Sequence, residues 1–249
     1  MVKISFELPV AYLEDFPSEN HYIIAPWVIS SKRYHDFYKA AKGYKILDNG
    51  AFEGAPMEFQ DLMKIARDLR VDVVVLPDYL RDYERTWKAL IQIGHISKIV
   101  QHQFKWMIVP QASSAAWHIA YNSLIGLAEK LFPAEQLVVG MPVWLDREPG
   151  ISRRKLFDWM TNANMWRFNL PHHYLGISSL FEFDILSNHF ESADTSHPIK
   201  MGFNLDTIDD FTISRRYERP AYFHELLLTA EQLAKAKQAA NEMIKRWGS

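Results

Sequence analysis

Residues 71–79 read VDVVVLPDY, a short run of β-branched residues that ends in a proline and an aspartate. Runs that are apolar without polar alternation are typical of strands buried on both faces of a parallel sheet. The stretch that follows, Tyr83–Gln101, repeats its apolar residues with helical spacing instead. A strand followed by a helix is the repeating unit of α/β proteins, so this segment predicts one βα unit.

The same alternation extends in both directions along the chain. Eight runs predict strands: His21–Ile29, Tyr44–Leu47, Val71–Leu76, Trp106–Pro110, Gln136–Pro142, Trp166–Ile177, a weak one at Ser192–Thr195, and Ile199–Asn204. Amphipathic helices are expected at Glu58–Leu69, Tyr83–Gln101, Ala115–Phe132, Arg153–Asn162 and Leu180–Phe190, and a charged helix at Ala230–Trp247. Eight such units predict a (β/α)8 TIM barrel. An open doubly wound sheet is the rival, but no GxGxxG or Walker sequence occurs.

Composition favours one domain over residues 1–249, since 48% hydrophobic residues suffice for one core. Ile4–Val10 is expected as a short extra strand that caps the N-terminal end of the barrel, and 205–223 as an irregular excursion. No stretch approaches the roughly 18 apolar residues of a membrane helix and no secretory signal is recognised, so we expect a cytoplasmic protein without a membrane partner. The absence of cysteine excludes disulfides, thiolate nucleophiles and cysteine-bound zinc.

Polar residues end several of the predicted strands. In a TIM barrel the catalytic groups lie at the carboxyl ends of the strands, so these residues are expected to meet at one mouth. Each has a simpler interpretation as well: an aspartate before Asn-Gly, or after a proline, is common in turns and helix caps. A shared pocket explains their joint occurrence more economically. The residues are Asp48 in LDNGAFEG, Asp78 in VVVLPDY, Gln111 in MIVPQA, Gly140 and Met141 in VVGMP, and Asp194 in SADTS.

The ordered set DNGAF, LPD, VPQ, VVGM, YLG and AD resembles the tRNA-guanine transglycosylase superfamily over roughly residues 21–204. The resemblance implies a (β/α)8 barrel that exchanges a guanine base through a covalent glycosyl intermediate. It implies Asp194 as the nucleophile and Asp48 as the general acid/base. It implies base-binding roles for Asp78, which pairs with the donors of the base, and for Gln111 and the Gly140 N–H, which read its carbonyl. Phe52 and Leu175 are expected on the two faces of the base, and Met141 is a further base-binding residue.

These roles agree with general chemistry. A purine edge with donors beside an acceptor needs a carboxylate opposite the donors and an N–H opposite the carbonyl, with flat apolar walls above and below. Displacement at an anomeric carbon needs one ionised carboxylate as nucleophile and a second group that moves the proton, as in retaining glycosidases. No metal and no cofactor are expected.

The chain departs from the tRNA-modifying members in two ways. Their zinc site uses three cysteines and a histidine, which a cysteine-free chain cannot supply, and an added RNA-binding domain is missing from these 249 residues. Both departures favour the compact DpdA-like branch, whose members act on DNA and insert 7-cyano-7-deazaguanine or a relative. We therefore expect DNA and a free 7-deazaguanine base as substrates. The same exchange on tRNA, an N-glycoside hydrolase and a catalytically silent nucleic-acid-binding homologue stay open, as does the oligomeric state.

A net charge of −2 lacks the basic excess of many nucleic-acid binders, so phosphate contacts must be local. Trp144 and Trp166 can stack on bases or fill the shell between helices and barrel. His172 and His173 are expected as packed residues on opposite faces of a strand rather than metal ligands. An acidic cluster, Asp206, Asp209 and Asp210, is expected as a solvated loop. Candidate phosphate contacts are Arg153, Arg154 and Lys155, and also Arg215, Arg216 and Arg219; Lys245 and Arg246 form a further basic pair.

Overall fold

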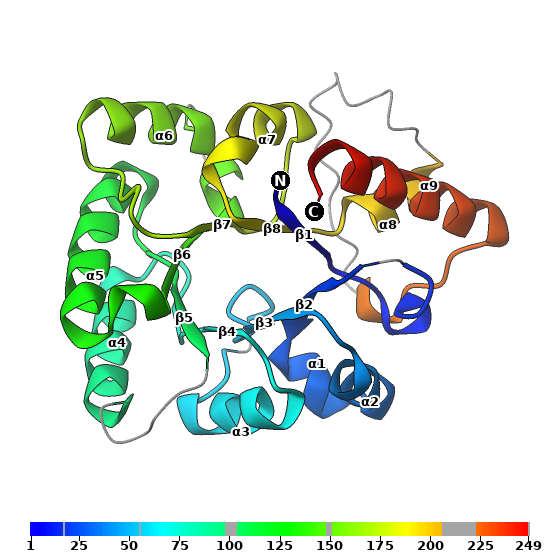
Figure 1. The fold of residues 1–249 in the computed structure, drawn as a ribbon, viewed down its shortest axis with the longest axis horizontal. Coiled ribbons are helices and arrows are strands. Elements are labelled where there is room, and N and C mark those ends of the chain that lie inside the picture. Colours follow the sequence, from blue (N-terminus) through cyan, green and yellow to red (C-terminus); the bar gives the residue numbers. More distant parts are fainter. Residues whose placement is uncertain (17, 55, 98–103, 148–150, 206–222, 249) are drawn as a thin grey trace.

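A closed barrel of parallel strands forms the centre of the molecule in the computed structural model, which describes residues 1–16, 18–54, 56–97, 104–147, 151–205 and 223–248 (Figure 1). The strands follow one another in chain order, and the last pairs with the first to close the ring. This confirms the predicted (β/α)8 barrel. The strands are β1 Lys3–Phe6, β2 Asn20–Ile24, β3 Tyr44–Asp48, β4 Val73–Val75, β5 Lys105–Ile108, β6 Leu137–Met141, β7 His172–Tyr174 and β8 Ser192–Thr195.

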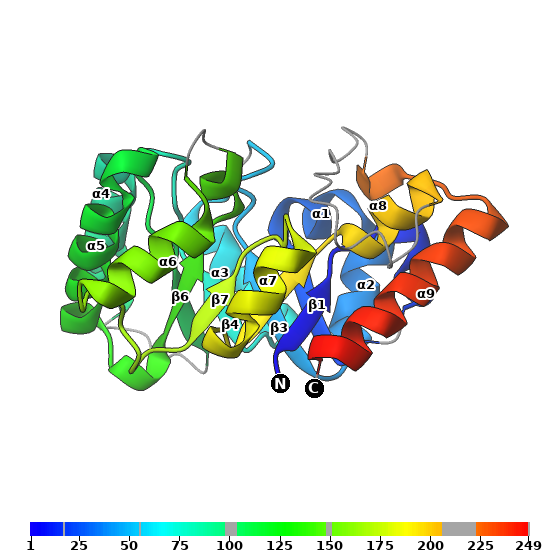
Figure 2. The same ribbon diagram turned by 90° about the horizontal axis from the view of Figure 1, so that it is seen from above.

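Helices surround the barrel, and the views in Figure 1 and Figure 2 show them as an outer layer around the strands. Among the described residues, no helix is both long enough and apolar enough to cross a membrane. The predicted C-terminal helix is present as α9. The helices are α1 Ala25–Ser30, α2 Lys32–Ala40, α3 Phe59–Leu69, α4 Tyr83–Ser97, α5 Trp117–Leu131, α6 Arg153–Asn162, α7 Leu180–Leu186, α8 His197–Asn204 and α9 Ala230–Trp247.

Local sequence explains why these elements form where they do. The three valines of β4 are at most 1% exposed, as expected for a strand covered by side chains on both faces. Several helices begin at a Ser or Thr whose side chain accepts a hydrogen bond from a backbone N–H of the first turn, which satisfies a donor that the helix leaves unpaired. These caps are Ser31 for α2, Ser152 for α6, Ser179 for α7 and Thr229 for α9.

The two ends of the predicted strand order were wrong. Lys3–Phe6 is not a cap below the barrel but its first strand, since it pairs in parallel with both β2 and β8. Ile199–Asn204 is not the eighth strand but belongs to α8, which carries Pro198 in its first turn. Its residues Ile199, Met201 and Phe203 suggest strand alternation, but the segment is helical, and its packing on α9 helps to bury Ile199, Met201 and Gly202.

Two other predicted strands were too long. His21–Ile29 contains most of β2 and then continues into α1, which has a proline at its start. Of Trp166–Ile177 only His172–Tyr174 is a strand. The helix α2, which lies between α1 and β3 in the chain, was not predicted. The predicted excursion after the barrel falls almost entirely on 206–222, outside the described residues.

Candidate active site

The carboxyl ends of the strands enclose a cavity of about 790 Å³. Parallel strands end on the same side of a barrel, so residues far apart in the sequence meet there. The structure brings most of the predicted site residues to this cavity. Those that line it are Asp48 at the end of β3, Asp78 after β4, Gln111 after β5, Asp194 in β8, and Phe52 and Leu175 in the loops after β3 and β7.

Asp194 is held from one side only. Its Oδ1 atom accepts a hydrogen bond from the backbone N–H of Gly176 at 2.9 Å and contacts Nε2 of His173 at 3.0 Å. Within the described parts of the chain its Oδ2 atom accepts no hydrogen bond. The side chain is 6% exposed and lines the cavity. The carboxylate is therefore oriented by one oxygen and presents the other to a ligand.

His173, which sequence reasoning set aside as a packed residue, lies inside the barrel. It is fully buried, and its Nδ1 is 2.7 Å from the hydroxyl oxygen of Ser192 while Nε2 faces Asp194. An Nε2–H that donates to the carboxylate leaves Nδ1 to accept from Ser192. Its ring stacks on that of Tyr22 at 5.8 Å and 9°. His173 thus fixes the orientation of Asp194.

His172 points to the opposite face, as strand alternation predicts. Its ring stacks on Trp166 at 4.1 Å, and its Nε2 lies 2.9 Å from the Tyr121 hydroxyl. Burial lowers the pKa of His172 to about 4. The two histidines therefore do not share a site. Trp166 fills the shell between barrel and helices, and no three His, Asp or Glu side chains among the described residues gather to hold a metal ion.

Asp48 has both carboxylate oxygens in hydrogen bonds. The Tyr22 hydroxyl donates to Oδ2 at 2.6 Å, and the Gly50 N–H donates to Oδ1 at 2.7 Å. The second bond is the turn interaction that the Asp-Asn-Gly sequence predicts, and Gly50 has a φ of 84° that favours glycine. Burial, and next the nearby Glu53 carboxylate, raise the pKa of Asp48 to about 8. Asp48 therefore holds a proton at neutral pH that it can donate.

Asp78 lies in a net of amide groups. Asn49 donates to its Oδ1 at 2.7 Å, and Gln111 Nε2 donates to Oδ2. The Gln111 carbonyl oxygen accepts from Trp144 Nε1 and from the Arg81 N–H, each at 3.0 Å, which fixes the direction of its amide. Burial raises the pKa of Asp78 to about 6. One N–H of the Gln111 amide thus donates to Asp78, which is ionised at neutral pH. The second N–H of the same amide group lies next to this carboxylate.

Gly140 and Met141 do not line the cavity, contrary to their predicted base-binding roles. Met141 is fully buried, and its carbonyl accepts from the Leu175 N–H at 3.1 Å. A Cβ at Gly140 would lie 2.8 Å from Val109 and 2.9 Å from Leu175, both of which do line the cavity. Gly140 therefore lies next to the cavity wall without being part of it, and its missing side chain leaves room for Val109 and Leu175.

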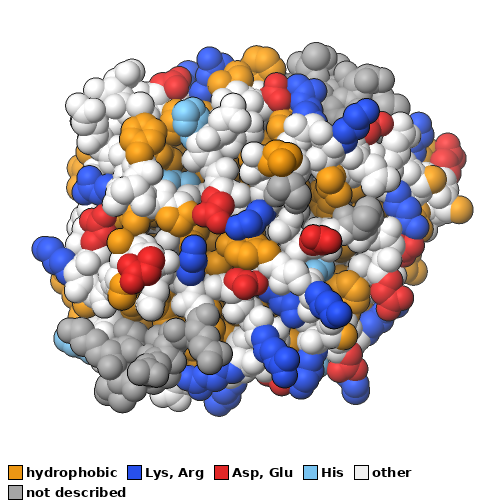
Figure 3. Space-filling model, in the orientation of Figure 1, with side chains coloured by type: hydrophobic (Ala, Val, Ile, Leu, Met, Phe, Trp, Pro, Cys, Tyr) orange, Lys and Arg blue, Asp and Glu red, His pale blue; other side chains and the backbone are white. Residues whose placement is uncertain are grey.

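The predicted phosphate contacts divide into three groups. Arg153 is fully buried in an ion pair with Asp146, so the prediction that it contacts phosphate was wrong. Arg154 and Lys155 are exposed at the start of α6. Figure 3 shows basic and acidic side chains intermixed on the face in view. Arg215, Arg216 and Arg219, and the acidic residues Asp206, Asp209 and Asp210, lie outside the described residues.

The cavity continues beyond the predicted residues toward β1 and α8. This part has aromatic and charged walls that sequence reasoning missed, because they come from loops and from α1 and α8, whose residues were assigned to strands. His197 is fully enclosed there, and burial lowers its pKa to about 3. The lining residues of this part are Glu7, Trp27, Ser196, His197, Lys200, Phe223 and His224.

No protein-family model matches the sequence, and no curated protein matches it either. A function for the chain therefore rests on the geometry of the cavity and on the resemblance of its strand-end residues to a known superfamily.

Proposed function

We propose that this barrel is a guanine transglycosylase that exchanges guanine in DNA for a 7-deazaguanine base. The observation that carries the proposal is the pair Asp194 and Asp48 in one cavity. Asp194 is oriented through Oδ1 with Oδ2 open to a ligand, while Asp48 has its pKa raised to about 8. One carboxylate is thus arranged as a nucleophile and the other as a proton donor, the division of labour found in retaining glycosyl transfer.

In the first step, Asp194 Oδ2 attacks C1′ of the target nucleotide. The bond from C1′ to N9 of guanine breaks, its electron pair goes to the base, and Asp48 supplies the proton that the leaving base needs. The product is a sugar esterified to Asp194. In the second step, the ring nitrogen of the incoming base attacks C1′, the C1′–O bond to Asp194 breaks, and the proton of that nitrogen returns to Asp48.

The base is read by the amide net around Asp78. Ionised Asp78 faces the ring N–H and exocyclic amine of guanine, and the second N–H of Gln111 donates to the carbonyl of the base. The indole N–H of Trp144 and the Arg81 N–H hold the Gln111 amide in that direction. Adenine presents an acceptor where guanine has a donor, and would leave the buried carboxylate unpaired. Phe52 and Leu175 offer apolar surface to the faces of the base.

DNA is the preferred polymer because the cysteine-free chain lacks the zinc site of tRNA-modifying enzymes. A stacked guanine hides its C1′, so the target nucleotide must leave the duplex or lie in a single strand. Arg154 and Lys155 stand exposed at the start of the helix that follows β6, where phosphates can be held.

The test is incorporation of labelled guanine into double-stranded DNA, single-stranded DNA and tRNA by the wild-type protein, with Asp194→Ala in parallel. Label that enters DNA with the wild type alone is the expected result. Label that enters tRNA alone would support the same base exchange with tRNA, rather than DNA, as the substrate. Release of free guanine without incorporation would make the protein an N-glycoside hydrolase, and binding without either reaction would make it a silent homologue.

A further inference from the structure

Arg153 is a fully buried arginine whose hydrogen-bond partners include residues that line the cavity. Its Nη2 lies 2.7 Å from Oδ2 of Asp146, and its Nε lies 2.8 Å from the same atom. The guanidinium lies 3.5 Å over the Tyr174 ring. Asp146 lines the cavity, whereas Arg153 does not. A buried ion pair is on average no more stabilising than apolar side chains of similar volume, so stability alone gives little reason for one here.

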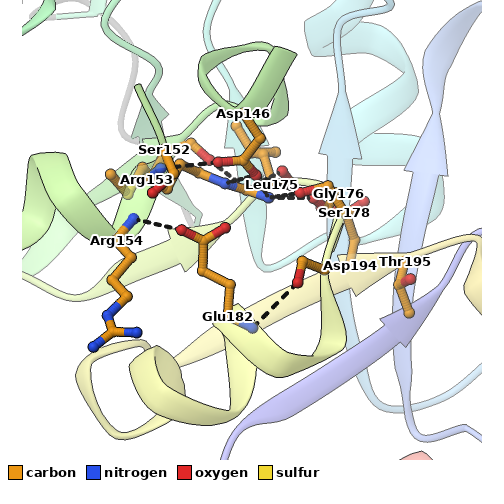
Figure 4. A network of polar contacts seen from close by, with 12 residues as sticks. Asp146, Ser152, Arg153, Arg154, Leu175, Gly176, Ser178, Glu182, Asp194 and Thr195 are labelled. Atoms are coloured by element: carbon orange, nitrogen blue, oxygen red, sulfur yellow. Dashed lines mark hydrogen bonds and ion pairs between the residues drawn. The ribbon is translucent and has the colours of Figure 1, made fainter. Parts of the chain in front are cut away.

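The far edge of the guanidinium is bound to the loop after β7 (Figure 4). Nη1 donates to the carbonyl oxygen of Leu175 at 2.6 Å, and Nη2 donates to that of Gly176 at 2.7 Å. Nη2 also lies 3.2 Å from the hydroxyl of Ser178. Only a planar fork with several N–H groups can reach the carboxylate on one side and two successive carbonyls on the other.

The Leu175 carbonyl and the Gly176 N–H belong to the same peptide group. Its oxygen accepts from the Arg153 cation, and its N–H donates to Asp194 Oδ1 at 2.9 Å. Hydrogen bonds in such a chain polarise one another, so a cation on the carbonyl strengthens the N–H as a donor to the carboxylate. Gly176 has a φ of 62°, a backbone conformation that glycine adopts without strain.

We infer that Arg153 is a positioning residue for Asp194, acting through the peptide group between Leu175 and Gly176; this role in the reaction rests on the proposed function. Arg153 holds the peptide so that its N–H occupies Oδ1, which leaves Oδ2 as the attacking oxygen. Asp146 and Ser178 fix the guanidinium, so the chain Asp146, Arg153, peptide, Asp194 acts as one unit.

The link can be measured without activity. Leu175–Gly176 is the single Leu-Gly pair in the sequence, so labelling leucine with ¹³C at the carbonyl and glycine with ¹⁵N gives one NMR signal for this peptide group. In Arg153→Met the Gly176 amide proton is expected to move upfield, since its hydrogen bond to Asp194 weakens. Lys45→Met is the matched control, because Lys45 is another buried cation bound to backbone carbonyls, those of Tyr38 and Leu69, outside the cavity.

The kinetic expectation is a lower kcat at nearly constant KM. A misplaced reacting group costs on the order of 100-fold in rate, so Arg153→Met is expected to lose about that factor in kcat with KM changed by less than about twofold. Arg153→Lys keeps the charge and one carbonyl contact, and is expected to recover part of both the rate and the amide shift. If Arg153→Met does not fold, Arg153→Lys carries the test through the same two readouts.

A folded Arg153→Met or Arg153→Lys protein whose Gly176 signal stays where Lys45→Met leaves it would overturn the inference. So would a rate loss carried by KM alone. A wild-type protein without base exchange but with the amide shift in Arg153→Met would overturn the proposed function instead, and the link between Arg153 and Asp194 would stand.

Discussion

At the scale of single residues, the cavity holds carboxylates of the same type in different environments. Asp48 is enclosed beside Glu53, and its pKa rises to about 8. Asp78 receives two amide donors that partly offset its burial, and its pKa rises only to about 6. At neutral pH the first is mostly protonated and the second mostly ionised. Under the proposed function, these environments suit the two aspartates to opposite tasks: Asp48 as proton donor and Asp78 as acceptor of base N–H groups.

The Asp48 assignment predicts an alkaline limb in the pH profile of kcat/KM. The protonated form is the active acid, so activity is expected to be full just below pH 8, down to about pH 6 where Asp78 becomes protonated, and to fall about tenfold per pH unit above pH 8. Asp48→Asn removes the limb and lowers the rate by about 100-fold or more. Glu53→Gln removes a neighbouring negative charge, which lowers the pKa of Asp48 and moves the limb to lower pH. A limb that Glu53→Gln does not move would assign it to another group.

The Asp78 assignment predicts the opposite dependence for binding of free guanine. Ionised Asp78 pairs with the donors of the base, so affinity is expected to be constant above pH 6 and to weaken as pH falls below it. Asn49→Ala removes a hydrogen bond that favours the ionised form, and is expected to raise this midpoint. Isothermal titration calorimetry across pH 5 to 8 measures both. Affinity that does not change over this range would contradict the assignment.

At the scale of elements, the ends of strands could be predicted and the partners of their side chains could not. Asp48, Asp78 and Asp194 stand directly at the ends of apolar runs, a signal within a few residues. Tyr22 and His173 hold two of these carboxylates from other strands, and which His of the pair enters the barrel depends on register. From the sequence, Arg153 was interpreted as a surface cation, because no local pattern indicates that Asp146 is its buried partner.

The strand count illustrates the same limit. KISF at residues 3–6 is short and half polar, and only its pairing with β2 and β8 identifies it as a barrel strand. The opposite error arose at residues 199–204, where every second residue is apolar although the segment is helical. Seven of the eight predicted strands overlap β2 to β8, and only long-range pairing identifies the first strand of the barrel.

Strand β6 supports the wall of the cavity through a glycine, which gives a prediction for this element. Gly140→Ala forces Val109 and Leu175 to move by a fraction of an ångström, because its Cβ would lie under 3.0 Å from both. The variant is expected to lose about 1–3 kcal/mol of unfolding free energy and to bind free guanine more weakly. Gly126→Ala is the control, since a Cβ there meets nothing within 4 Å. Equal stability and affinity in the two variants would contradict this role for Gly140.

At the scale of the whole molecule, a net charge of −2 must be reconciled with the polyanionic substrate that we propose. DNA binding must then rest on few phosphate contacts. The logarithm of the DNA association constant is therefore expected to fall with a shallow slope against the logarithm of the salt concentration. Arg154→Ala with Lys155→Ala is expected to weaken DNA binding equally for all sequences and to reduce the salt slope by about 2, with guanine affinity unchanged. Lys64→Ala, an exposed lysine on α3, serves as the control. A salt slope that the double variant leaves unchanged would place the phosphates elsewhere.

The most direct test of the central claim is mass spectrometry of the protein quenched in acid during turnover with its DNA substrate and then digested. The account predicts a sugar-phosphate adduct on the peptide that contains Asp194, absent from the Asp194→Asn protein and from a reaction without DNA. Base exchange that proceeds with no adduct, or with the adduct on a different residue, would contradict the assignment of Asp194 as the nucleophile.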